Sequence, residues 1–574
     1  MTMAADPSPV SRGPVSMPMK KGWQRLFAEP NAIWMREMRQ SARLGRTPWI
    51  LFALTLSIAL LMCAIGAIAA SDRTSPATLG QSLFQSFFSI GYFVVMLVGP
   101  TIAANSIAAE REGRTWEAVL LTGLTPKEIT RGKFMAAYTS IALYIVVLAP
   151  VGALSFLFGG VTATEVIIAF AFLFLFAGLA VAFGLAVSSL MASLRGAIVV
   201  TLILAICIGP MLYGFLGAAL SAGVHELWPA MPQFSPIWLP LAYERAPFGL
   251  EYVTLLIVIP LLLIVLPAWF LYETTISNLT GPSDDRSFGL KRWFVVSAPL
   301  LAATCAVPSL LGTSNDSRAV LACWGVSTFA AFITFCLFMF VFEPYGPSRR
   351  VTIHLLREGA GPLRRFFGPG LMKSVTLVIL LGILGIVGIA MFDAGALEAY
   401  GTAAVDREID IQKVFVWTAY TALFSLFIAG LVTWLRARDN TPWIARLIAF
   451  AILFLVSALP WIIVAIGSVT ASGTEDQWAL VASPSPFFAF AMISALDKVD
   501  AGATVEFGFG CAMAWGFVGF GLLAAAARRC SRAVTRYEAS LAQAEAAFRD
   551  EDAALARAAS APAEAAAPAP PTTA

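Results

Sequence analysis

Residues 165–190, EVIIAFAFLFLFAGLAVAFGLAVSSL, decide the fold. Glu165 is the only charged residue in this run, and most of the others are Leu, Phe, Ala, Val or Ile. A helix of about 20 mainly apolar residues crosses the hydrocarbon core of a bilayer, so we predict a membrane span here. Eleven further runs of spanning length follow the same pattern, at about 49–70, 82–105, 134–158, 197–220, 252–272, 293–313, 319–342, 372–392, 413–435, 447–470 and 503–527.

The composition of the whole chain supports this interpretation. Of its 574 residues, 59% are hydrophobic and only 13% are charged, whereas a soluble domain is roughly half apolar and a quarter charged. These values exclude a soluble enzyme, a disordered chain and a nucleic-acid-binding protein. We predict an all-α polytopic membrane protein of about twelve transmembrane helices whose surroundings are the lipid bilayer.

Lysine and arginine are unevenly distributed between alternate loops, which predicts the orientation. The loops 106–133 and 343–371 are rich in basic residues, and acidic residues dominate 394–412 and 471–501. We predict that both termini and the two basic loops face the cytoplasm, and that the acidic loops and 221–250 face outward.

The span order suggests two halves with one plan. We expect a first six-span half at 49–283 and a second, divergent half at 284–529, since both place a long inner segment between their second and third spans. Their last outer loops share a short signature, Phe234-Ser235-Pro236 and Ser485-Pro486-Phe487-Phe488. The alternative is that any twelve-span chain can be divided this way.

The two ends of the chain differ from the spans. In the cytoplasmic segment 1–48, apolar residues such as Ile33 and Trp34 alternate with Arg36, Glu37 and Arg39, which predicts an amphipathic helix on the membrane surface. In the cytoplasmic tail 530–574, we expect a polar helix to about 558 and then a disordered Ala/Pro segment.

Ionisable residues are scarce in the predicted spans. None lies at the centre of a span, and we expect six near the span ends to reach water: Glu165, Glu251, Glu273, Lys373, Asp393 and Glu506. A self-contained ion-coupled carrier or a membrane-embedded enzyme would need buried groups of this kind. The chain also has no phosphate-binding loop, and its seven Cys and two His show no metal-ligand spacing. We therefore expect no enzyme activity, cofactor or metal in this chain.

The loop after the second span carries the most specific pattern. From Glu110 it reads EREGRTWEAVLLTGLTPKEITRGK, ending at Lys133. Gly123 can end a short helix, and Thr125-Pro126-Lys127-Glu128 has the form of a capping box with Pro at the first helical position. We predict two short helices and a turn that form a rigid, charged elbow suited to a groove on a partner.

This segment resembles the cytoplasmic coupling segment of type-two ATP-binding-cassette (ABC) transporter permeases. Asn31-Ala32-Ile33-Trp34-Met35-Arg36-Glu37-Met38-Arg39 is similar to the basic segment that precedes the first span in that family. Two positions depart from the family pattern: Gly113 and Arg114 stand in reversed order, and Gly123 replaces a Pro.

The resemblance implies a permease subunit in a bacterial inner membrane. Its partner would be a separate ABC ATPase subunit that binds the ATP, and export would be the direction of transport. The residues implied in ATPase coupling are Glu110, Glu112, Gly113, Thr115, Trp116, Glu117, Leu120, Leu121, Thr125, Pro126, Glu128, Gly132 and Lys133, and those implied in the N-terminal amphipathic helix are Arg36, Glu37 and Arg39.

Two other functions fit a twelve-span chain. One is a secondary carrier of the major-facilitator kind, whose characteristic inner loop residues 110–133 do not reproduce. The other is a non-transport membrane scaffold. The number of copies also has two alternatives, since one chain could supply the whole membrane domain or pair with a second permease copy.

Overall fold

The computed structural model describes residues 31–43, 46–71, 75–229, 242–281, 283–312, 314–357, 359, 361–400, 404–438, 441–470, 475–496 and 502–560. Within these ranges the chain forms helices and no strands. The expectations for Phe234-Ser235-Pro236, for residues 1–30 and for the tail from 561 onward lie outside the described residues.

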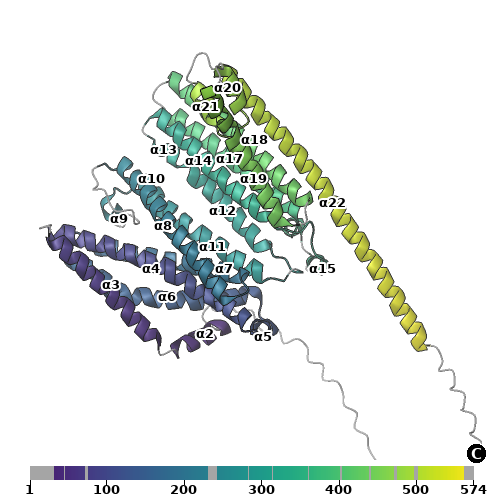
Figure 1. Ribbon diagram of the computed structural model, residues 1–574, viewed down its shortest axis with the longest axis horizontal. Coiled ribbons are helices and arrows are strands. Elements are labelled where there is room, and N and C mark those ends of the chain that lie inside the picture. The colour runs from purple at the N-terminus through teal and green to yellow at the C-terminus, as the bar shows by residue number, and fades with distance from the viewer. Residues whose placement is uncertain are drawn as a thin grey trace, which may run out of the picture. The chain divides into compact units, whose positions relative to one another are not determined.

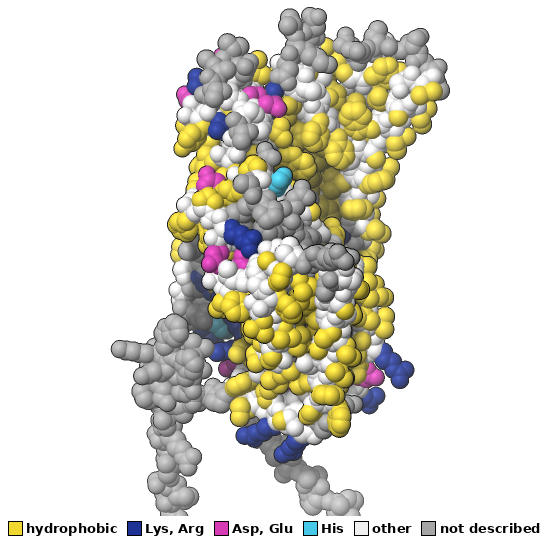
Figure 2. Space-filling model, turned by 90° about the vertical axis from the view of Figure 1, so that its left-hand side faces the viewer, with side chains coloured by type: hydrophobic (Ala, Val, Ile, Leu, Met, Phe, Trp, Pro, Cys, Tyr) yellow, Lys and Arg dark blue, Asp and Glu magenta, His cyan; other side chains and the backbone are white. Residues whose placement is uncertain are grey.

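Twelve helices in the described part of the chain are long and apolar enough to cross a membrane. Each coincides with one of the predicted apolar runs, which confirms the all-helical, multi-pass prediction at this level. Hydrophobic side chains cover much of the face seen in Figure 2, as a lipid-exposed surface requires. The candidate spans are 48–69, 76–112, 126–157, 163–190, 194–214, 250–279, 288–311, 315–340, 371–400, 407–438, 442–469 and 503–556.

Several helices continue beyond the apolar runs that predicted them. The second span was expected at 82–105, but its helix extends to Glu112, and the last was expected at 503–527, but its helix extends to Ser560. An apolar run predicts only the part of a helix that lipid surrounds. The helix itself can continue through polar residues, because its backbone hydrogen bonds do not depend on apolar side chains. The segment 530–558 is thus helical, as an unbroken extension of the last span.

The contacts divide the chain into two compact units. One lies within Met1–Ala218 and Phe234–Glu244, and the other within Ala219–Gln233 and Arg245–Ala574. The sixth span belongs to the second unit because its helix packs against the seventh. These units are defined by contacts alone, so the two six-span halves at 49–283 and 284–529 stay a prediction.

The first unit is built around two closely packed helices, α4 and α7 (Figure 1). A Cβ atom on Gly184 of α7 would lie 2.2 Å from the Pro100 carbonyl oxygen of α4, so only glycine fits there. Ser188 Oγ also donates to the Ala104 carbonyl oxygen at 2.6 Å. Small residues and hydroxyls are the usual means of joining helices in lipid. The helices of this unit are α2 (Ala32–Ala42), α3 (Arg46–Ser71), α4 (Pro76–Glu112), α5 (Trp116–Leu121), α6 (Pro126–Leu157), α7 (Ala163–Leu190), most of α8 (Leu194–Leu227) and most of α9 (Ala242–Arg245).

The second unit has a larger core formed by α12, α14, α17, α18 and α22. The α18–α22 contact again depends on glycine, since a Cβ on Gly430 would lie 2.2 Å from the Gly519 carbonyl oxygen. Its elements are α10 (Leu250–Tyr252), η1 (Val253–Val258), α11 (Ile259–Leu279), α12 (Phe288–Ala306), α13 (Pro308–Leu311), α14 (Asn315–Phe340), α15 (Arg349–Arg357), α16 (Pro362–Phe366), α17 (Leu371–Tyr400), α18 (Ala404–Arg438), α19 (Pro442–Thr470), α20 (Glu475–Ala482), α21 (Phe488–Leu496) and α22 (Gly502–Ser560).

Candidate functional site: the 110–133 elbow

The elbow begins where α4 ends in a tight turn. The Thr115 N–H donates to the Glu110 carbonyl oxygen at 2.9 Å, and the Arg114 N–H donates to that of Arg111 at 3.2 Å. This pair of bonds is the Schellman motif, which places one residue in the left-handed conformation. That residue is Arg114, with φ +54°. The chain thus leaves α4 at a fixed angle.

Neighbouring residues in the sequence also determine where α5 ends and where α6 begins. Gly123 follows α5 with φ +75°, a left-handed conformation that glycine adopts without a Cβ clash. At the start of α6, the Glu128 N–H donates to Thr125 Oγ1 at 3.3 Å, and the Thr125 N–H donates to Glu128 Oε2 at 2.8 Å. The capping box therefore forms as its residues predict, with Pro126 in the first turn.

Four charged side chains brace the elbow. Lys133 of α6 has no exposed surface, and its Nζ lies 3.0 Å from Glu37 Oε1 and 2.9 Å from Glu110 Oε2. The same Nζ donates to the Ser106 carbonyl oxygen at 2.8 Å. Arg36 pairs with the other oxygen of Glu110. Two cations and two carboxylates thus join α2, α4 and α6, and we call these four residues the brace.

The helix α2 also packs directly on α6. A Cβ on Gly132 would lie 2.4 Å from Asn31 Oδ1 and 2.8 Å from Ile33 Cβ, so this contact requires glycine. Asn31 accepts from the Ile33 N–H at 2.9 Å to cap α2, and its Nδ2 donates to the Glu128 carbonyl oxygen at 2.8 Å. Asn31 begins the segment that resembles the ABC permeases, but its role as a helix cap was not among the predicted residue roles. Its position immediately before the amphipathic helix is the signal for it.

Burial affects the chemistry of the brace at Glu37. The pKa of Glu37 is raised above its ordinary value of 4.5, because desolvation outweighs the attraction of Lys133. As the pH falls, Glu37 therefore becomes protonated at a higher pH than an ordinary glutamate does.

Two further residues connect the elbow to other spans. Arg111 donates to the Ser189 carbonyl oxygen at 2.8 Å and to that of Met191 at 3.2 Å, at the end of α7. Glu112 Oε2 accepts from the Leu194 N–H at 2.6 Å, at the start of α8. A positive group at a helix C-terminus and a negative group at an N-terminus each complement the helix dipole.

The surface left open for a partner is small and partly apolar. Leu121 of α5 is 87% exposed and Leu120 is 46% exposed, whereas Val119 is buried. Trp116 is half-buried, with the Arg111 guanidinium 5.7 Å from its ring centre. Glu117 is exposed on the same short helix.

The predicted coupling residues therefore have different roles in the structure. Glu110, Gly132 and Lys133 lie inside the elbow, and Glu112, Thr125 and Glu128 are engaged in caps. Leu120, Leu121 and Glu117 remain exposed. Gly113, Thr115 and Pro126 shape its turns, and Trp116 is half-buried. Arg36, Glu37 and Arg39 all lie on α2, where Arg39 is exposed.

The corresponding loop of the second unit has a different plan. Its basic stretch forms the short helices α15 and α16, and an extension of α22 packs beside it through an Arg349–Glu545 ion pair of 2.6 Å. Glu343 is held by Lys291 at 3.1 Å and by the Gly370 N–H at 2.8 Å. Burial raises the pKa of Glu343.

One sequence expectation about ionisable residues is wrong. We expected Glu165, Glu273 and Asp393 to reach water from span ends, but all three side chains are buried. Glu165 belongs to a capping box with Thr162, and Glu273 pairs with Arg292 at 2.5 Å. Asp393 meets the hydroxyl of Ser309 at 2.6 Å. Neighbouring helices cover these positions, and a single span's sequence does not reveal such cover.

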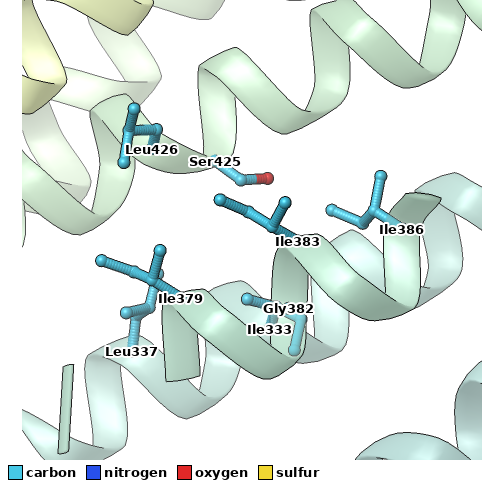
Figure 3. A pocket seen from close by; sticks show the side chains of 8 residues that line it. All are labelled: Ile333, Leu337, Ile379, Gly382, Ile383, Ile386, Ser425 and Leu426. Atoms are coloured by element: carbon cyan, nitrogen blue, oxygen red, sulfur yellow. The ribbon is translucent and has the colours of Figure 1, made fainter. Parts of the chain in front are cut away.

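A small apolar cavity lies between α14, α17 and α18, shown in Figure 3. Its volume of about 10 Å³ is at the lower limit for one water molecule, so it is no substrate chamber. Ser425 contributes the polar side chain seen there, and Ile333, Leu337, Ile379, Ile383, Ile386 and Leu426 surround it with Gly382. In the described residues, no group of three or more His, Cys, Asp or Glu side chains could hold a metal ion.

Comparison with known proteins gives no family assignment. No protein-family model matches the chain, and no match is found among curated proteins.

Proposed function

We propose that this chain is the membrane permease subunit of an ABC exporter, with a separate ATPase docking on the elbow. The resemblance of residues 110–133 and 31–39 to type-two ABC permeases supports this proposal. The observation that carries it is the exposed apolar end of α5, where Leu121 is 87% exposed on an otherwise braced elbow. We place the chain in a bacterial inner membrane with both termini cytoplasmic, in agreement with its Lys/Arg distribution.

The contacts of the elbow suggest how it would transmit motion. A partner that pushes on α5 displaces the ends of α4 and α6, because short turns connect α5 to both helices. The brace joins the same two ends to α2, so α2 moves with them. Arg111 and Glu112 extend the connection to α7 and α8. Displacement of one short helix is thus shared among several spans, which is what coupling ATP hydrolysis to transport needs.

The test is whether Leu121 binds the ATPase. Buried aliphatic anchors contribute about 1–4 kcal/mol to an interface, so Leu121→Asp should remove an ATPase that co-purifies with the tagged chain from its own cells. Leu356→Asp is a matched control, since Leu356 is 60% exposed on α15 of the second unit. ATP hydrolysis by each purified sample is measured after checking that the membrane content of each variant is normal.

The expected pattern is loss of both the ATPase and ATP hydrolysis in Leu121→Asp alone. Glu117→Lys should weaken the complex less, and mainly at low salt, since exposed charges act chiefly on association. Wild-type chain that purifies without any ATP-hydrolysing subunit would contradict the proposal. Loss of the ATPase in Leu356→Asp but not in Leu121→Asp would assign docking to the second unit instead.

A proton-coupled secondary carrier is the second candidate, and the burial of Asp393 favours it. Intramembrane carboxylates usually mark ion or proton pathways. Transport by the purified chain in vesicles separates the two candidates. A carrier needs only a proton gradient, whereas a permease subunit needs its ATPase and ATP.

A further inference from the structure

Asp393 lies in an unusual setting in the second unit. Its side chain on α17 has no exposed surface, although the residue is within a candidate membrane span. One carboxyl oxygen, Oδ1, is 2.6 Å from Ser309 Oγ on the short helix α13. The other, Oδ2, is buried and has no hydrogen-bond partner in the described part of the chain.

The hydrogen bonds of Ser309 limit the protonation state of Asp393. Ser309 Oγ lies 2.8 Å from the Ala306 carbonyl oxygen as well as 2.6 Å from Asp393 Oδ1. A serine hydroxyl has one proton to donate, and the Ala306 carbonyl can only accept. Each contact has its own proton if Asp393 is a neutral acid that donates to Ser309 while Ser309 donates to Ala306.

The surroundings provide little for a charged carboxylate. The thiols of Cys305 on α12 and Cys323 on α14 are within electrostatic reach of Asp393. On α18, the ammonium group of Lys413 is 3.0 Å from Asp410 and 3.7 Å from Asp316, so it is already held by two carboxylates. A buried carboxylate without a cation and with an unbonded oxygen is costly, whereas a neutral acid is far less so.

We propose that Asp393 and Ser309 form a proton-binding site between α17 and α13. Asp393 carries the proton and donates it in a hydrogen bond to Ser309. Release needs water: when α13 and α17 separate, the acid gives its proton to a water molecule, leaving a carboxylate and a hydronium ion. This site is independent of the elbow and of the ABC proposal, and it would be the proton site of the second candidate, the proton-coupled carrier.

Infrared spectroscopy of the full chain tests the proposal directly. A neutral carboxylic acid gives a carbonyl stretching band that a carboxylate lacks, and the band shifts in D2O. The chain is purified at neutral pH in a detergent without ester carbonyls, with ¹³C-labelled aspartate to distinguish Asp from Glu. We expect an aspartic acid band in the wild type that is lost in Asp393→Asn. The band should persist in Asp316→Asn, the matched control, because the Asp316 side chain is 76% exposed.

Two further measurements keep the test decisive. Asp393→Asn should fold normally, since its amide N–H can still donate to Ser309, but if it does not, Ser309→Ala supplies the readout by shifting the same band. Raising the pH with the protein folded should convert the band to carboxylate reversibly. Absence of an aspartic acid band at neutral pH, or a band unchanged in both Asp393→Asn and Ser309→Ala, would overturn the proposal.

Discussion

Arg114 shows how one residue can conflict with the turn that contains it. It occupies the left-handed position of the Schellman motif that ends α4, with φ +54°. Glycine is strongly preferred at this position. The neighbouring Gly113 has φ −76°, a conformation open to any residue. The type-two ABC permease pattern that this segment resembles has Arg before Gly, an order that would place glycine where the turn needs it.

We therefore expect Arg114→Gly to stabilise the chain. The left-handed conformation costs a non-glycine residue roughly 1–2 kcal/mol, and part of this gain is offset by the greater flexibility of unfolded glycine. The net gain should be about 1 kcal/mol in thermal unfolding of the detergent-solubilised protein. Gly113→Ala is the control and should not stabilise the chain, because its φ of −76° already suits any residue and its Cβ would lie 3.1 Å from the Ala109 carbonyl oxygen. A lower melting temperature for Arg114→Gly would show that the arginine side chain contributes more than its backbone conformation costs.

Glu37 predicts a pH dependence at the same scale. Its pKa is raised above 4.5, so the folded chain keeps this proton to a higher pH than the unfolded chain does. Stability must then fall as the pH rises from the unfolded pKa through the folded one. Glu37→Gln removes this fall, so the wild type should lose stability relative to the variant as the pH rises above 4.5.

Thermal unfolding over a pH series measures this difference. Glu117→Gln makes the same change of charge on the exposed surface of α5 and serves as the control. If the wild type and Glu37→Gln show parallel pH profiles, Glu37 does not titrate differently in the folded chain.

At the scale of helices, Gly132 determines how closely α2 approaches α6. A Cβ there would lie 2.4 Å from Asn31 Oδ1 and 2.8 Å from Ile33 Cβ, below any normal contact. Gly132→Ala should therefore push α2 away from α6 and lengthen the ion pairs of the brace.

We expect Gly132→Ala to increase amide hydrogen exchange across α2 and to lower the melting temperature. Gly178→Ala is the matched control, because a Cβ at that helical glycine would meet only Tyr138 Cε2, at 3.9 Å. Unchanged exchange in α2 of Gly132→Ala would mean that the helix adjusts without separating.

For the whole molecule, the Lys/Arg distribution predicts the topology. A single cysteine at position 127 should be protected from a membrane-impermeant reagent in intact cells, and one at 408 should be labelled. The background must lack the native cysteines, since Cys63 and Cys207 are exposed. Strong external labelling at 127 would reverse the predicted orientation and remove the elbow from the cytoplasm.

The local features of this protein can be predicted from its amino-acid sequence. The twelve spans follow from runs of apolar residues, since the preference for lipid is summed along one segment. The capping box at Thr125 and the left-handed Gly123 follow from neighbouring residues, because caps and turns involve contacts only a few positions apart.

Which charged residues stay exposed to a partner depends on how the helices pack. Glu110 and Lys133 look like surface charges in the sequence. In the structure, Glu110 of α4 pairs with Arg36 of α2, 74 positions away, and Lys133 of α6 pairs with Glu37 of α2, 96 positions away, and with Glu110. These contacts take both side chains out of the surface. Asp393 looks like a span-end residue, yet α13 covers it. Whether a side chain is buried depends on which other helices pack around it, and the hydropathy of one helix does not show which helices those are.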